Sequence, residues 1–253
     1  LRSIGSLFLI CTGFIMKQKV SFKLIKENML ILILSGVTLG LNWILLFQAY
    51  KYTSISNATL SYYFAPIFVI MLAPIILKEK LTAKKIVCVI MAMAGLFLIV
   101  RVGSSSASGD YNHIRGIMYG LLAAVFYASV ILMNKFIKNL SSFETTLIQL
   151  MVAALVLFPS IIYQGNLNLS QISSTTWIFI LIIGILHTGI AYLLYFSSIK
   201  GLNGQSIAIL SYIDPVTAVV MASVFLGEPI TLVKIIGAIL ILGSTSLSEI
   251  STS

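Results

Sequence analysis

Two ionisable side chains lie deep inside apolar stretches of the sequence, where a charge is costly. Asp214 is the one acidic residue set far inside such a stretch (SYIDPVTA), and His187 lies in another (ILHTGIAY). Lys200 separates the two stretches, 13 residues after His187 and 14 before Asp214. On two consecutive helices both would therefore lie about 20 Å deep, where they could meet near the midplane. We expect Asp214, together with His187, to bind a proton or a cationic substrate group and couple it to a conformational change. An Asp before a Pro is also typical of a helix cap, and the two roles can coexist.

Two prolines interrupt apolar stretches at matching places in the two halves of the chain. Proline lacks an amide hydrogen, so it frees a carbonyl and breaks a helix, and paired breaks are typical of a transporter's midplane binding site. The alternative is a plain kink that packing tolerates. Polar and aromatic residues around the prolines could hold an organic molecule by stacking or cation–π contact, although a single Tyr more often packs between helices or at the headgroups. The candidate substrate-cavity residues are Asn42, Trp43, Tyr62, Tyr63, Pro66, Tyr127, His187, Tyr192, Tyr195, Ser211, Tyr212 and Pro215.

A Glu-x-x-Thr pattern occurs twice, each time thirteen residues after one of these prolines. Glu79 and Glu228 would end their helices, and Thr82 and Thr231 would cap the next ones, so we interpret the pattern as a structural turn rather than a gate. Small residues at every fourth position, Gly116, Gly120, Ala124 and Ala128, indicate close helix packing. That packing would lie either within the bundle or between the protomers of a homodimer.

The composition is that of a membrane protein. Of the 253 residues 59% are hydrophobic and 9% charged, with a mean hydropathy of +1.07, whereas soluble domains carry about a quarter charged residues. The net charge of +9 comes from basic residues in short loops, which indicates topology signals rather than a nucleic-acid surface. Two cysteines in separate apolar runs, two histidines and the absence of zinc or triad motifs give no disulfide framework, metal site, cofactor or enzyme signature.

Nine apolar stretches are long enough, or nearly so, to cross a bilayer as helices. Basic residues concentrate in alternate loops, eleven on one side and five on the other. We therefore expect the loop that contains Lys17 to Lys26 and the C-terminus to be cytoplasmic. The membrane is expected to be the cell membrane. The predicted spans are 1–16, 28–50, 56–77, 84–101, 115–137, 143–163, 176–198, 204–226 and 233–249.

The sequence contains an internal repeat. A shift of 149 residues, without a gap, aligns Pro66 with Pro215, Tyr63 with Tyr212 and Glu79 with Glu228. The third span thus matches the eighth, five crossings later, and because five is odd the two copies must have opposite orientations. Inverted repeats are typical of secondary transporters; the alternative is an old duplication that now serves only as a scaffold. The second copy has five spans and the first has four, so we expect a tenth helix before Leu1.

These motifs give the chain a family resemblance. It resembles the drug/metabolite transporter superfamily in its EamA-like branch, through LNWILLFQAYKYTSISNATLSYYFAPIFVIMLAPIILKEKLTAKKI in the first half and RGIMYGLLAAVFYASVILMNK, HTGIAYLLYFSSIKGL and LSYIDPVTAVVMASVFLGEPITLVKIIGAILILGS in the second. The resemblance implies an all-α integral membrane bundle of two inverted five-helix repeats. We place the first repeat at 1–102, an extracellular linker at 103–114 and the second repeat at 115–250.

We therefore predict a secondary transporter, not an enzyme, whose partners are a small-molecule substrate and the lipid bilayer. It would export or exchange small organic metabolites or drugs by alternating access, with proton coupling as a further hypothesis. A membrane receptor or structural subunit would also explain nine helices, as would a passive channel. An intramembrane enzyme is disfavoured. Gly204-Gln205-Ser206 is faintly similar to an intramembrane serine site, but Ser206 would lie near the cytoplasmic end, far from the depth of His187.

Overall fold

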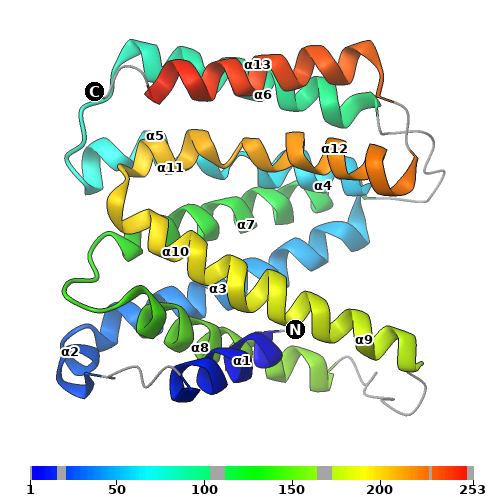
Figure 1. Ribbon diagram of the computed structural model, residues 1–253. Helices are drawn as coiled ribbons and strands as arrows, with labels where there is room; N and C mark the ends of the chain where they lie inside the picture. The colour runs from blue at the N-terminus through cyan, green and yellow to red at the C-terminus, as the bar shows by residue number, and fades with distance from the viewer. Residues whose placement is uncertain (1, 16–20, 103–111, 164–172, 228–229, 250–253) are drawn as a thin grey trace. The chain divides into compact units, whose positions relative to one another are not determined.

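The chain is helical in every part that the structure describes. The computed structural model describes residues 2–15, 21–102, 112–163, 173–227 and 230–249, and all regular elements in these segments are helices (Figure 1). Seven helical stretches are long and apolar enough to cross a membrane, and two shorter apolar helices lie at the first and ninth predicted spans. The described residues thus confirm an all-α, multi-pass membrane bundle. The helices are α1 (Arg2–Ile15), α2 (Phe22–Glu27), α3 (Met29–Tyr52), α4 (Ile55–Tyr62), α5 (Ala65–Ile76), α6 (Ala83–Val102), α7 (His113–Asn134), α8 (Ser142–Tyr163), α9 (Ser174–Ile182), η2 (Ile183–Ile190), α10 (Ala191–Gly201), α11 (Gly204–Leu210), α12 (Ile213–Leu226) and α13 (Leu232–Glu249).

Two of the predicted spans are broken helices. The third consists of α4 and α5, and the eighth of α11 and α12. Each break comes just before a proline, because the proline cannot donate an intrahelical hydrogen bond and its ring clashes with the preceding turn. Pro66 lies in the first turn of α5, where the missing amide hydrogen costs nothing.

The seventh span contains a wider π-helical segment that the sequence did not indicate. Residues Ile183–Ile190 form η2, which includes His187 and joins α9 to α10 into one continuous span. Such segments are rare and frequently occur at functional sites. η2 packs on α1 through glycines: a Cβ on Gly184 would come within 2.6 Å of Ile4, and one on Gly189 within 2.6 Å of Phe8.

The chain divides into two compact units, which we describe separately. Unit 1 comprises residues 1–44 and 129–201. In it α1 packs on η2 and α8, and α8 also packs on α10. Gly36 and Gly40 allow α3 to approach α8 closely, at Val152 and Val156. A small apolar cluster around Leu32, Ile137 and Leu140 lies beside α2.

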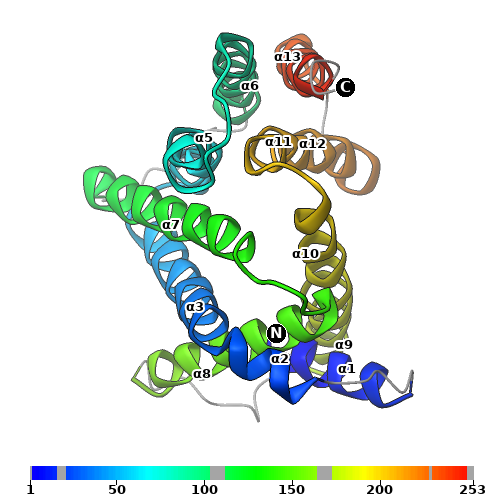
Figure 2. The ribbon, with the colours of Figure 1, turned by 90° about the vertical axis from the view of Figure 1, so that its left-hand side faces the viewer.

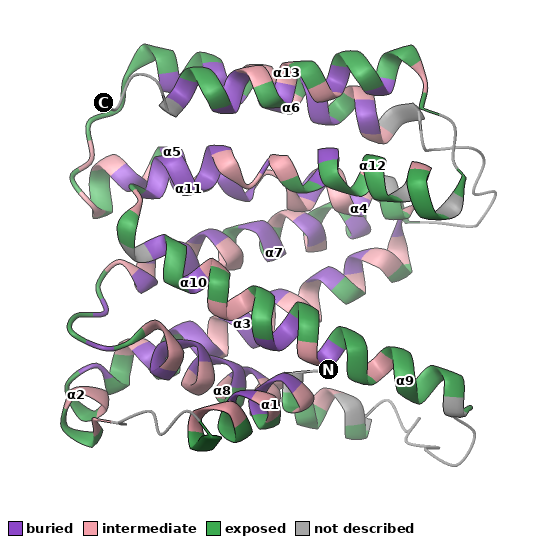
Figure 3. Ribbon diagram, viewed as in Figure 1, coloured by how far each residue is buried: buried purple, intermediate pink, exposed green. Residues whose placement is uncertain are grey.

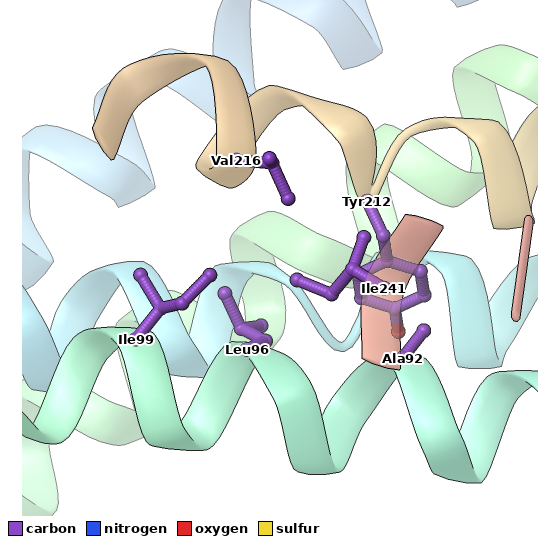
Figure 4. Packing of buried hydrophobic residues seen from close by; sticks show 6 residues of the cluster. All are labelled: Ala92, Leu96, Ile99, Tyr212, Val216 and Ile241. Atoms are coloured by element: carbon purple, nitrogen blue, oxygen red, sulfur yellow. The ribbon is translucent and has the colours of Figure 1, made fainter. Parts of the chain in front are cut away.

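Unit 2 comprises residues 45–128 and 202–253. Its α6 and α13 lie side by side along their length (Figures 1 and 2). They are antiparallel, because Gly95 contacts Gly237 and Ile241 whereas the later Ile99 contacts Gly237. Together with α12 they enclose a buried core, in which Tyr212 and Ile241 face α6 (Figure 4). The core residues are Ala92, Leu96, Ile99, Tyr212, Val216 and Ile241.

The helices that pack on one another in unit 2 are repeat partners. A shift of 149 residues carries α6 onto α13, α4 onto α11 and α5 onto α12. Since α6 and α13 run antiparallel, the two copies have opposite orientations there. For these three helix pairs of unit 2 the fold therefore confirms the inverted repeat.

The surface of the helices is largely apolar. Exposed residues occur on most helices (Figure 3). Many of them are large and hydrophobic, among them Ile75 at 76%, Leu155 at 70% and Phe225 at 71%. Water-soluble monomers rarely expose large apolar patches. Lipid chains would cover these side chains in a membrane.

The small-residue stripe of α7 packs within the chain. Gly116 approaches Thr53, and Gly120 approaches Ser61 and Ala58, so close that a Cβ on either glycine would clash. Both alanines of the stripe are fully buried. The stripe therefore packs inside the bundle, and the homodimer stays a prediction.

Candidate functional site

The helix breaks of unit 2 are joined by a tyrosine pair. The Tyr212 hydroxyl donates a hydrogen bond of 3.1 Å to the main-chain carbonyl oxygen of Tyr63. The two rings are stacked with centroids 6.3 Å apart. Tyr63 is the C-cap of α4 and Tyr212 follows α11, so each tyrosine lies in the gap of its own broken helix. The bond gives a partner to a carbonyl at the break, where the regular helical bond is lost.

Two further tyrosines extend this pair into an aromatic cluster. Tyr62 packs edge-on against Tyr63, with centroids 6.2 Å apart, and lies 5.6 Å from the ring of Tyr127 on α7. Tyr62, Tyr63 and Tyr127 are half-buried, whereas Tyr212 and Pro66 are buried. Four of the predicted cavity residues are therefore in ring contact within unit 2.

Asp214 lies in the first turn of α12, close to the same break. The helix begins at Ile213, so Asp214 is its second residue and not the N-cap that the Asp-Pro pair suggested. A carboxylate in the first turn of a helix is still stabilised by the positive end of the helix dipole. The rest of the protein leaves Asp214 exposed, half-buries Ser211 and buries Pro215. The Ser211 hydroxyl donates to the carbonyl of Ile207, one turn earlier.

Unit 1 contains a second aromatic cluster, around η2 and α10. Trp43 Nε1 donates a hydrogen bond of 3.2 Å to the Tyr192 hydroxyl. The Tyr192 ring has edge contacts with His187 at 6.3 Å and with Phe196 at 5.5 Å. Tyr195 reaches Phe196 at 5.6 Å. His187 is exposed from the protein on the π-helical segment.

The other predicted member of this cluster, Asn42, precedes Trp43 and is fully buried. The sequence also predicted that His187 and Asp214 meet. His187 belongs to unit 1 and Asp214 to unit 2, so their meeting stays a prediction.

Both clusters contain a contact between repeat partners. Trp43 and Tyr192 are 149 residues apart, and so are Tyr63 and Tyr212. Two equivalent residues of an inverted repeat can touch only where they lie beside the local two-fold axis. Trp43 and Tyr192 in unit 1, and Tyr63 and Tyr212 in unit 2, therefore lie where the two copies of the repeat meet.

The predicted turn residues lie at helix ends. Thr82 Oγ1 accepts a hydrogen bond from the Lys85 amide, and Thr231 Oγ1 accepts one from the Lys234 amide. Lys78 and Gly227, again 149 residues apart, both have left-handed backbones, with φ of 56° and 69°. Such a residue commonly ends a helix. Glu228 lies outside the described residues.

Glu79 has a more distant partner than a local turn would need. Its Oε1 accepts a 2.7 Å hydrogen bond from the Gly204 amide, and its Oε2 accepts a 3.2 Å bond from the Gln205 amide. Both amides are at the start of α11, in the second half of the chain. The carboxylate thus caps a helix of the other repeat.

Several buried polar residues were not predicted. Glu144 accepts hydrogen bonds from the Ser141 amide and hydroxyl and from the Ser21 amide. Ser141-x-x-Glu144 is a capping box, which the sequence could have revealed. Gln149 donates to the side chains of Ser35 and Asn134, a contact between distant segments that no local pattern signals.

The described residues contain no group of three or more His, Cys, Asp or Glu side chains that could hold a metal ion.

A family model described as the EamA-like transporter family matches residues 2–101 and 114–249. The chain belongs to the EamA-like transporter family. It is accordingly a multi-pass membrane transporter rather than an enzyme, with a small-molecule substrate and the lipid bilayer as its partners.

Relatives of this EamA-like transporter carry similarly general names. It is 33% identical over 223 residues to the Bacillus subtilis (strain 168) protein named "Uncharacterized transporter YxxF", an alignment that covers 88% of this chain and 70% of that one. An "Uncharacterized transporter" of Archaeoglobus fulgidus is 24% identical over 202 residues, with 79% and 69% covered. A solved structure called only "Crystal structure of protein" matches with a TM-score of 0.83 at 17% identity, over 99% of this chain and 85% of that one. That last likeness supports the fold alone.

Proposed function

We propose that this protein is a secondary transporter that exports or exchanges small organic molecules across the cell membrane by alternating access. The observation that carries the proposal is the direct contact of repeat partners at the helix breaks, Tyr63 with Tyr212. In an inverted repeat the two halves can exchange conformations, and a site on the axis is then reached from either side of the membrane in turn. The repeats proposed for this exchange are 1–102 and 115–250, joined by an extracellular linker at 103–114.

The class of substrate is proposed from the side chains at the repeat-partner contact of each unit. Phenol rings in unit 2, and indole, phenol and imidazole rings in unit 1, offer stacking faces, and their polar atoms offer a few directed hydrogen bonds. Such a surface suits a small organic molecule that combines an apolar or cationic part with a polar group. Amino acids, nucleosides and organic cations are the classes to test.

The driving force is proposed to be a proton gradient, coupled to transport by binding and release of a proton at Asp214. This carboxylate lies at the start of α12 and is not covered by the rest of the protein. It belongs to a helical stretch that is apolar enough and long enough to cross the bilayer. An ionisable group at such a position is costly and typically functional. Protonation would remove its charge and so alter the relative stability of the two conformations. The C-terminus is proposed to be cytoplasmic, from the excess of basic residues in alternate loops.

The test is transport by the purified chain in liposomes, with protein-free liposomes as the control. Radiolabelled amino acids, nucleosides and organic cations are offered in turn, with and without an imposed pH gradient. We expect one class to accumulate against its gradient when protons flow in the opposite direction. Counterflow without a pH gradient would show exchange instead, and movement that never exceeds equilibrium would show a passive channel. If no class moves faster than in protein-free liposomes, the proposal is wrong.

A further inference from the structure

Gln205 is a buried carboxamide that lacks hydrogen-bond partners. It is the second residue of α11, its exposed fraction is 0%, and neither its Nε2 nor its Oε1 is bonded within the part of the chain that the structure describes. A carboxamide offers two donor hydrogens and an acceptor oxygen, and burying these unpaired costs free energy. An apolar residue of similar size would stabilise this conformation better, so the amide calls for an explanation in function.

Gln149 shows how a structural amide looks in the same protein. It is also fully buried, but its Nε2 donates to Ser35 Oγ at 2.6 Å and to Asn134 Oδ1 at 3.0 Å. Of its amide atoms, Oε1 alone has no partner among the described residues. Gln149 thus joins three helices of unit 1, whereas the Gln205 side chain has no hydrogen-bond partner among the described residues.

The backbone around Gln205 is held by one carboxylate. The amides of Gly204 and Gln205 both donate to Glu79, so these backbone groups are occupied and the side-chain amide is the group left over. The Glu79 side chain also lies close to Gly204, where a Cβ would come within 3.3 Å of Oε1. Glu79 therefore holds the start of α11 through these two amides, and releasing them would free the helix end that carries Gln205.

We propose that Gln205 is a hydrogen-bonding contact for the transported molecule, reached when Glu79 releases the start of α11. This inference rests on the proposed transport function and specifies the substrate class. A molecule that satisfies a carboxamide must present a donor and an acceptor side by side, as primary amides and α-amino acids do. A lipophilic cation without hydrogen-bonding groups does not fit this contact.

The test begins with the stability of purified full-chain variants in detergent. Gln205→Leu is expected to raise Tm, because it removes two unpaired buried atoms and leaves no partner behind. Gln149→Leu is expected to lower Tm, because Ser35 and Asn134 lose their bonds. If Gln205→Leu does not fold, Gln205→Met serves the same purpose. A fall in Tm for every folded apolar variant at position 205 overturns the proposal, because the amide then has partners after all.

Ligand response separates a binding contact from a buried polar group of no function. L-glutamine, L-asparagine and nicotinamide are added at millimolar concentration, with tetraphenylphosphonium as the probe without hydrogen bonds. At least one amide or amino acid is expected to raise the Tm of the wild-type protein, with the Kd weakened about threefold to tenfold in Gln205→Leu. Tetraphenylphosphonium is expected to change the Tm of the wild-type protein and of Gln205→Leu by the same amount. No shift with any amide or amino acid, or equal shifts in both proteins, overturns the assignment.

Ser248→Ala is the matched control. Ser248 is fully buried on α13 and its Oγ has no partner among the described residues, so its removal also relieves an unpaired group. We expect a raised Tm with an unchanged ligand response. Counterflow of the stabilising ligand in liposomes then separates the two proposals. If wild type and Gln205→Leu transport it equally, the Gln205 assignment fails and the transport function stands, whereas binding without any transport removes the transport function.

Discussion

Tyr212 donates its phenolic hydrogen bond to the carbonyl oxygen of Tyr63, the residue that occupies the same place in the other repeat. The two breaks of the bundle are thereby tied to each other, and the ring of Tyr212 also forms part of the buried core between α6 and α13. A bond between equivalent residues is inherently asymmetric, since one hydroxyl donates and one carbonyl accepts.

Tyr212→Phe tests this bond. The variant keeps the ring in the core but leaves the Tyr63 carbonyl unpaired, which we expect to cost about 1–3 kcal/mol of unfolding free energy. The measurement is denaturant or thermal unfolding in detergent. Tyr119→Phe is the control, because Tyr119 stacks on Tyr52 and its hydroxyl has no hydrogen bond among the described residues. Equal losses in the two variants would contradict the role given to the bond.

Gly95→Ala tests the close packing of the repeat partners α6 and α13. A Cβ on Gly95 would come within 2.5 Å of the Gly237 carbonyl oxygen, and a backbone atom cannot move aside without shifting a helix. We expect overpacking to cost about 1–3 kcal/mol. Gly243→Ala, on the same helix pair but with nothing within 4 Å of its Cβ, should be neutral or slightly stabilising. Thermal unfolding of both variants decides, and a stable Gly95→Ala would contradict the observed helix approach.

Much of the fold could be predicted from the sequence because a bilayer leaves few choices. Apolar length fixes each span, and proline fixes where α4–α5 and α11–α12 break. The π-helical segment Ile183–Ile190 escaped prediction, because η2 is accommodated by packing against α1 and has no local signature. The short helix Phe22–Glu27 was also missed, since six residues are too few for a periodic pattern.

The site was predictable to the extent that it follows the repeat. The offset of 149 residues selected Tyr63 and Tyr212, and these do touch. The partner of Glu79 was not predictable, because a carboxylate that caps α11 at Gly204 depends on tertiary packing between segments 125 residues apart. The unpaired amide of Gln205 was equally hidden, since burial of a polar side chain leaves no trace in the local sequence.

A double-mutant cycle on Trp43 and Tyr192 tests the axial contact of unit 1. Tyr192→Phe keeps the ring contacts with His187 and Phe196 and removes the hydroxyl that accepts from Trp43 Nε1. Trp43→Phe removes the donor. We expect a coupling free energy of about 0.5–1.5 kcal/mol between the two changes, measured by unfolding in detergent. Strict additivity would show that the hydrogen bond contributes nothing to the stability of this unit.

Asp214→Asn tests proton coupling. The amide keeps the size of the side chain but cannot exchange a proton, so we expect counterflow to persist while an imposed pH gradient no longer drives accumulation. Asp214→Glu restores a carboxyl group at the start of α12 and should recover at least part of the gradient response. His187→Gln is measured alongside: if His187 shares the proton, its loss shifts the pH profile of transport, and if it does not, the profile is that of the wild type. Because Asp214 is exposed from the protein, Asn should leave Tm almost unchanged, so lost coupling cannot be attributed to unfolding. Undiminished gradient-driven accumulation by Asp214→Asn would remove this carboxylate from the transport mechanism.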